Sequence, residues 1–205
     1  MIGIIDYGVG NLFSLQCSFE KIGEDVQITN DPVKLQNADK LILPGVGAFE
    51  DAAKKLRQTG LDRLVAEEAK KGKPLMGICL GMQMLFEKSY EYGEHDGLGI
   101  LQGKVIGMAG TIPQHLMIPH IGWNSLHFTK PDCPIFRYIQ EHDSVYFVHS
   151  YYAVDCAPSL AATVEYGNEI TAAVALDNVF GCQFHPEKSG TVGLRILKAF
   201  CDLEA

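Results

Sequence analysis

The chain has 205 residues and a mass of 22.5 kDa, which allows one domain with a substantial core and excludes two full-sized domains. Its 47% apolar and 20% charged residues exclude disordered and fibrous proteins, and its net charge of −8 argues against a nucleic-acid binder. No apolar run approaches the ~20 residues that span a bilayer, and we see no secretory signal at the N-terminus, so we expect a single cytoplasmic domain over residues 1–205 without membrane or nucleic-acid contacts.

The first 90 residues alternate short apolar runs with amphipathic stretches. This order is typical of a parallel sheet with helices on both faces. We expect strands over residues 1–5, 25–29, 40–43 and 74–78. We expect helices over residues 12–22, over 48–71 with a break near Gly60, and over 80–88.

From Leu98 onward the pattern changes to short strand-like runs separated by turns, and the chain closes with an amphipathic stretch. We expect strands over residues 101–108, 121–128, 144–149, 160–164, 171–176 and 179–184, then a helix over 191–203. The fold class predicted from this order is α/β. It is a mostly parallel open sheet with helices on both faces, with additional antiparallel strands in the second half.

The six cysteines are scattered and form no CxxC pair, and without an export signal reduced thiols are the better interpretation. Most of them are expected to pack as small apolar side chains. The seven histidines show no zinc-ligand spacing, so we expect no structural metal site.

The strongest chemical signal is Gly77-Ile78-Cys79-Leu80-Gly81, at the point where an apolar strand gives way to a helical pattern. In such an elbow a strained turn presents the nucleophile, and the flanking glycines relieve crowding. The following helix start lowers the pKa of a thiol and offers N–H groups to an anion. The alternative is a buried cysteine between two packing glycines.

The second signal is Gln183-Phe184-His185-Pro186-Glu187. A cysteine nucleophile needs a base within hydrogen-bond reach, and the base needs a third group to orient it. Pro186 favours an extended His185, which puts Glu187 on the same side as the imidazole. A sequence of this kind is otherwise an ordinary turn.

The third signal is Pro44-Gly45-Val46-Gly47, after the strand predicted over 40–43. Ligands of open α/β sheets bind at the carboxyl ends of strands, and a glycine-rich loop there can present N–H groups to an oxyanion. Pro-Gly pairs also occur in plain turns.

Together, in this order and spacing, the three segments resemble the class I (triad) glutamine amidotransferases over essentially the full chain. The resemblance implies a catalytic triad of Cys79, His185 and Glu187, hydrolysis of L-glutamine, and no metal or organic cofactor. It implies an oxyanion hole formed by the backbone of Leu80 and of the Val46–Gly47 region. The residues that it implies for substrate binding are Gln83, Glu91, Ser150 and Tyr151.

Finer features resemble one branch of that family, whose members pass ammonia to a separate (β/α)8-barrel cyclase subunit in histidine biosynthesis, as a heterodimer. The segments that carry this resemblance are residues 4–12, 44–49 (PGVGAF), 77–83 (GICLGMQ), 121–124 (IGWN), 146–152 (YFVHSYY) and 183–190 (QFHPEKSG). It places six residues at the cyclase interface: Gly8, Asn11, Pro119, Trp123, Tyr146 and Lys188.

Some of these residues have simpler interpretations. A lone tryptophan such as Trp123 is more often a core anchor than an interface residue, and Tyr146 alternates with Phe147 and can simply pack. His120 and His149 lie in or next to the same segments and are expected to be core histidines with satisfied hydrogen bonds.

Val46 suggests regulation of the oxyanion hole. A β-branched residue resists positive φ, which a glycine would adopt at little cost. We therefore expect a poorly formed oxyanion hole in the free subunit, low basal activity, and a turn of this peptide when the partner binds with its ligand.

Three alternatives share parts of this pattern. One is a glutaminase subunit of pyridoxal phosphate or anthranilate synthesis. The segments 44–47 (PGVG) and 146–152 (YFVHSYY) argue against this alternative. The second is a paralogue that supplies ammonia to another synthase, such as one that modifies surface sugars. The third is a non-catalytic binding module, against which the intact Cys79, His185 and Glu187 argue. Peptidases or hydratases with a cysteine elbow would not be expected to have the H-P-E segment.

Overall fold

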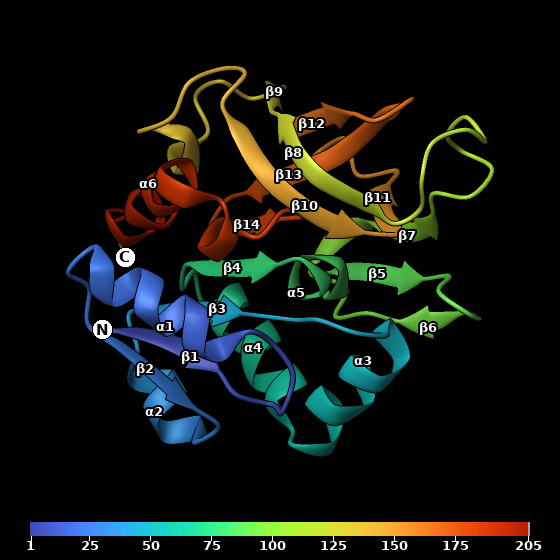
Figure 1. Cartoon of the computed structure of the whole chain (residues 1–205). Coiled ribbons are helices and arrows are strands. Elements are labelled where there is room, and N and C mark those ends of the chain that lie inside the picture. The colour runs from blue at the N-terminus through green and yellow to red at the C-terminus, as the bar shows by residue number, and fades with distance from the viewer. Residues whose placement is uncertain (205) are drawn as a thin grey trace.

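The computed structural model describes residues 1–204. Its largest sheet has eight strands in the order β2-β1-β3-β4-β14-β13-β12-β9 (Figure 1). The first five in this order pair in parallel. They are β2 (Val26–Thr29), β1 (Ile2–Ile5), β3 (Lys40–Leu43), β4 (Leu75–Ile78) and β14 (Val179–Cys182).

The other three strands of this sheet pair antiparallel. They are β13 (Glu169–Leu176), β12 (Leu160–Glu165) and β9 (His127–Phe128). The remaining strands form two smaller sheets. One joins β8 (His120–Ser125) to β10 (Ser144–His149), and the other has the order β11 (Tyr151–Val154), β7 (Leu101–Gly107), β5 (Phe86–Ser89) and β6 (His95–Asp96).

Helices cover both faces of the large sheet, and two apolar clusters fill the space between them. The first cluster includes residues of α1 (Leu12–Lys21), α6 (Gly190–Cys201) and the 3-10 helix η1 (Pro134–Phe136). The second includes residues of α2 (Pro32–Asn37), α3 (Phe49–Gln58), α4 (Leu61–Lys70) and α5 (Leu80–Met84). The short 3-10 helix η2 (Pro186–Lys188) leads into α6.

The predicted fold class is confirmed, and every strand predicted in the first 90 residues is present. One predicted helix is too long. The stretch 80–88 is helical only to Met84, and β5 begins at Phe86. The N–H groups of Leu98, Ile100 and Leu101 donate to the carbonyls of Met84 and Leu85, so pairing with a later segment replaces the next helical turn.

The structure also departs from the prediction at one strand of the second half and at one helix of the first half. The run 121–128 is divided into β8 and β9 at Leu126, whose N–H donates to Asp143, and β9 joins a different sheet. The sequence reading missed helix α2, although its signal was present: Asp31 caps it by accepting from the Val33 N–H, and Pro32 is its first residue.

All six cysteines are free thiols, and four of them, Cys79, Cys133, Cys156 and Cys182, are buried. Within residues 1–204, no helix is both long enough and apolar enough to cross a membrane.

Candidate active site

Cys79 lies at the junction of β4 and α5 in a strained backbone conformation, with φ 54° and ψ −112°. Positive φ is uncommon for a residue with a side chain and marks a site held by its surroundings. Two backbone hydrogen bonds fix it: the Cys79 N–H donates to Cys182 of β14 at 2.7 Å, and the Gln83 N–H donates to the Cys79 carbonyl at 3.1 Å. This is the geometry expected of a nucleophile elbow.

The glycines around Cys79 are required by close backbone packing. A Cβ on Gly81 would lie 1.9 Å from the Leu43 carbonyl oxygen, and one on Gly77 would lie 2.7 Å from the Gly81 carbonyl oxygen. A Cβ on Gly45 would lie 2.6 Å from the Gly81 nitrogen. The elbow therefore packs directly against the Pro-Gly loop that follows β3.

His185 follows β14 in an extended conformation, and its Nδ1 lies 2.8 Å from Oε1 of Glu187. Both side chains are almost fully buried. Burial alone would lower the pKa of His185, but its interactions with Cys79 and Glu187 raise it to about 9. The H-P-E segment thus presents an oriented imidazole beside the cysteine.

A cavity of about 540 Å³ opens beside these residues, within the range of small-molecule sites. Except for Glu187, which supports His185 from behind, every residue predicted for catalysis, the oxyanion hole or substrate binding lines it. These lining residues are Val46, Gly47, Cys79, Leu80, Gln83, Glu91, Ser150, Tyr151 and His185.

Gln83 is held by two acceptors. Its Nε2 donates to the Tyr151 carbonyl and to Oε1 of Gln183, both at 3.0 Å. Because both amide hydrogens are used, the side-chain oxygen is left to accept from a ligand. Gln183 in turn places its Nε2 3.8 Å from the Cys79 sulfur. Our sequence reading did not assign Gln183 a role, although its spacing of two residues before His185 would have been a signal.

Two side chains fix the ends of the loop after β3. The Tyr7 hydroxyl donates to the Pro44 carbonyl at 2.7 Å, and the Phe49 N–H donates to Glu91 at 2.7 Å. Burial, and next to it the nearby Cys79, raise the pKa of Tyr7 well above its usual range. Burial also raises the pKa of Glu91, against the opposing effect of the Phe49 N–H. No sequence signal had singled out Tyr7.

Of the six residues predicted for the partner interface, two line the cavity. Pro119 and Lys188 line its wall. Trp123 is 54% exposed, packs edge-on against Tyr146 with ring centroids 6.0 Å apart, and lies near Gly190. The core-anchor interpretation of Trp123 is therefore wrong. The two other members are Gly8, which is exposed, and Asn11, which precedes α1.

His120 and His149 are buried beside the cavity, as expected for satisfied core histidines. His120 Nδ1 lies 3.2 Å from His149 Nε2, and His149 Nδ1 lies 2.9 Å from the Tyr151 carbonyl. Their rings therefore connect the cavity wall to β8.

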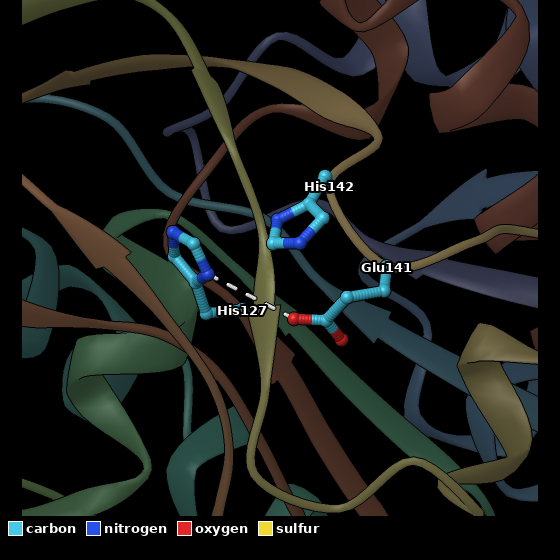
Figure 2. Close-up of side chains that lie close together, drawn as sticks. All are labelled: His127, Glu141 and His142. Atoms are coloured by element: carbon cyan, nitrogen blue, oxygen red, sulfur yellow. Dashed lines mark ion pairs between the residues drawn. The ribbon is translucent and has the colours of Figure 1, made fainter.

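Figure 2 shows a second group of titratable side chains, His127, Glu141 and His142, whose possible metal-ligand atoms lie within 4.8 Å of one another. His127 Nδ1 is 3.8 Å from Glu141, whereas tetrahedral zinc would bring its ligand atoms to about 3.4 Å. Both Glu141 oxygens accept from the Phe128 N–H, and the His142 N–H donates to Leu126. These contacts hold the turn before β10.

A family model described as glutamine amidotransferase class-I matches residues 4–202. The chain is 51% identical to the imidazole glycerol phosphate synthase subunit HisH of Caldanaerobacter subterraneus subsp. tengcongensis, over 99% of this chain and 98% of that one. It is 49% identical to the protein of the same name from Syntrophotalea carbinolica, over 99% of this chain and 100% of that one.

Solved structures at lower identity share the fold. PurLQS from Thermotoga maritima superimposes with a TM-score of 0.77 at 21% identity, covering 98% of this chain and 97% of that one. The glutaminase domain of Trypanosoma brucei CTPS, solved with bound acivicin, has a TM-score of 0.69 at 14% identity, covering 100% of this chain and 94% of that one.

Proposed function

The chain belongs to the class-I glutamine amidotransferase family, and we propose that it is the glutaminase subunit of an imidazole glycerol phosphate synthase. It hydrolyses L-glutamine to L-glutamate and ammonia in histidine biosynthesis. The observation that carries this proposal is the strained Cys79 in one cavity with His185, whose imidazole is bonded to Glu187. Relatives that bear this name match over essentially their whole length.

The first half of the reaction forms a thioester. The Cys79 thiolate attacks the side-chain amide carbon of glutamine, giving a tetrahedral oxyanion. When the C–N bond breaks, His185 donates a proton to the leaving nitrogen and ammonia departs. Glu187 accepts from Nδ1–H throughout, which keeps the imidazole in one orientation and stabilises its cationic form.

The second half releases glutamate. A water molecule attacks the thioester carbon while His185 takes its proton, and the C–S bond breaks to return Cys79. In both halves the oxyanion is stabilised by the Leu80 N–H at the start of α5 and by an N–H of the Val46–Gly47 region. Gln83, Glu91 and the backbone of Ser150 and Tyr151 hold the amino-acid end of the substrate.

Ammonia leaves for a separate (β/α)8-barrel cyclase subunit, with which the chain forms a heterodimer. There it reacts with phosphoribulosylformimino-aminoimidazole carboxamide ribonucleotide to give imidazole glycerol phosphate and aminoimidazole carboxamide ribonucleotide. Lys188, exposed directly after Glu187, offers a cation to an acidic group of the partner. The exposed apolar residues Ile118, Ile121 and Trp123 near the cavity supply contact area.

The test is glutamate release from L-glutamine by the purified chain, first alone and then with its cyclase and the ribonucleotide. We expect low basal activity, strong stimulation by the complete system, and none in Cys79→Ala. Glutamate release that the cyclase does not stimulate would favour a paralogue with another partner. The absence of glutamate release in every mixture would favour a binding module and would overturn the proposal.

A further inference from the structure

A hydrogen-bond network connects the cavity to strand β8. Its members are Gln83, the Tyr151 carbonyl, His149, His120 and Asn124. His149 is neutral at pH 7, because burial lowers its pKa to about 4. Its Nδ1 faces the Tyr151 carbonyl, which can only accept, so Nδ1 carries the hydrogen and Nε2 is bare. His120 Nδ1, 3.2 Å away, therefore donates to His149 Nε2. One tautomer of each ring follows from these contacts.

At the cavity end, the hydrogen-bond network includes Gln83 and reaches Gln183, whose side chain lies beside Cys79. The Tyr151 carbonyl accepts from His149 and also from Gln83, whose second amide hydrogen goes to Gln183. Two fixed acceptors set the angle of the Gln83 amide and so the direction of its free oxygen. If the Tyr151 carbonyl moves, Gln83 loses one of the two contacts that aim it.

At its other end, the hydrogen-bond network reaches Asn124 on strand β8. The His120 ring is stacked between Phe147, at 4.9 Å, and Tyr166, at 4.0 Å between ring centroids. Its Nε2 lies 2.8 Å from the side-chain oxygen of Asn124, next to the exposed Trp123. Because the neutral His120 ring carries its hydrogen on Nδ1, its bare Nε2 needs a donor, and a turn of the Asn124 amide supplies the NH₂ group in place of that oxygen.

We propose that His149 and His120 are positioning residues for glutamine binding, which hold the Tyr151 carbonyl and through it the Gln83 amide. This inference rests on the proposed glutaminase function. Neither ring takes part in bond making, so their loss acts on the affinity for glutamine more than on the chemical step. The same contacts make the glutamine site sensitive to the position of β8.

Two substitutions of His149 distinguish the effect of its hydrogen bond to the Tyr151 carbonyl from the effect of the volume that its ring fills. Asparagine places an NH₂ group where Nδ1 stands, so His149→Asn keeps the donor to the Tyr151 carbonyl. His149→Phe keeps the ring and loses both hydrogen bonds. In the complex with the cyclase and ribonucleotide, we expect His149→Phe to raise the KM for glutamine about 10-fold, with kcat within about 3-fold of the unsubstituted protein. We expect the KM of His149→Asn to lie close to that of the unsubstituted protein.

His120→Phe provides an independent variant that keeps the stacking between Phe147 and Tyr166 but removes the donor to His149; it is expected to raise KM in the same way. His115→Phe is the matched control, because His115 is exposed and does not belong to the hydrogen-bond network. A fall in kcat at unchanged KM, equal damage by the Asn and Phe variants of His149, or wild-type KM in both Phe variants would overturn the proposal. Failure of the glutaminase function itself would instead show as no Cys79-dependent activity in the unsubstituted complex.

Discussion

At the scale of single residues, the imidazole of His185 experiences opposing effects. Burial favours its neutral form, whereas Cys79 and Glu187 favour the cation and prevail, so its pKa rises from 6.5 to about 9. A proton held at neutral pH is available for the leaving ammonia. A pKa raised by folding also stabilises the folded protein: the contribution is complete below about pH 6.5 and is lost as pH rises through about 9.

Replacing Glu187 tests this charge balance. We expect Glu187→Gln to lower the pKa of His185 toward 6.5 and to reduce kcat/KM by about 10²–10⁴-fold, because the cation loses its partner. The free energy of unfolding should fall most below pH 6.5 and converge with the wild type above pH 9. An NMR titration of His185 with urea unfolding at three pH values measures both, and exposed Glu169→Gln is the control. An unshifted His185 pKa would contradict the argument.

At the scale of elements, the loop after β3 is fixed at both ends and free in the middle. Tyr7 holds the Pro44 carbonyl and Glu91 holds the Phe49 N–H, while Val46 is 41% exposed at the cavity. Gly47 has φ 88°, whereas Val46 is absent from the non-glycine residues with positive φ in the described chain. A turn of the Val46–Gly47 peptide can therefore occur without moving the elbow.

If the side chain of Val46 opposes that turn, removing it should activate the free subunit. We expect Val46→Gly to raise glutaminase activity without the cyclase by about 10-fold, since left-handed backbone costs a side chain roughly 1–2 kcal/mol. Val33→Gly, an exposed valine in α2, controls for a general effect of glycine. Partner-free activity equal to that of the unsubstituted chain would reject this role of Val46.

At the scale of the whole molecule, the cavity opens where three sheets meet. Figure 1 shows β4 and β14 side by side, with β10, β11 and β8 of the two smaller sheets. Cys79 and His185 follow β4 and β14, Ser150 lies between β10 and β11, Tyr151 begins β11, and β8 carries the exposed Trp123. An exposed tryptophan beside a cavity is a typical anchor for a protein partner.

Trp123→Ala should therefore weaken the complex. We expect the Kd for the cyclase to rise about 30-fold, which corresponds to the ~2 kcal/mol of a binding hot spot, as measured by calorimetry. Tyr138→Ala, at an exposed aromatic residue next to Asp202 beyond the end of α6, is the matched control. Equal affinities for the two variants would remove Trp123 from the interface.

The sequence by itself determined the features that depend on neighbouring residues. The order of strands and helices in the first half follows from apolar periodicity. The elbow at Cys79 and the pair of His185 and Glu187 were predictable because glycine, proline and two-residue spacing set local backbone geometry.

Only the tertiary structure decided what depends on residues far apart in the chain. Gln83 meets Gln183 across 100 residues, and Tyr7 meets Pro44 across 37. The helix after the elbow ends at Met84, because N–H groups of residues 98–101 donate to the carbonyls of Met84 and Leu85. Trp123 lies on β8, which pairs with β10 outside the large sheet, and its side chain is exposed. Such contacts have no local pattern, since the partner of each hydrogen bond and each apolar face is chosen by how the whole chain packs.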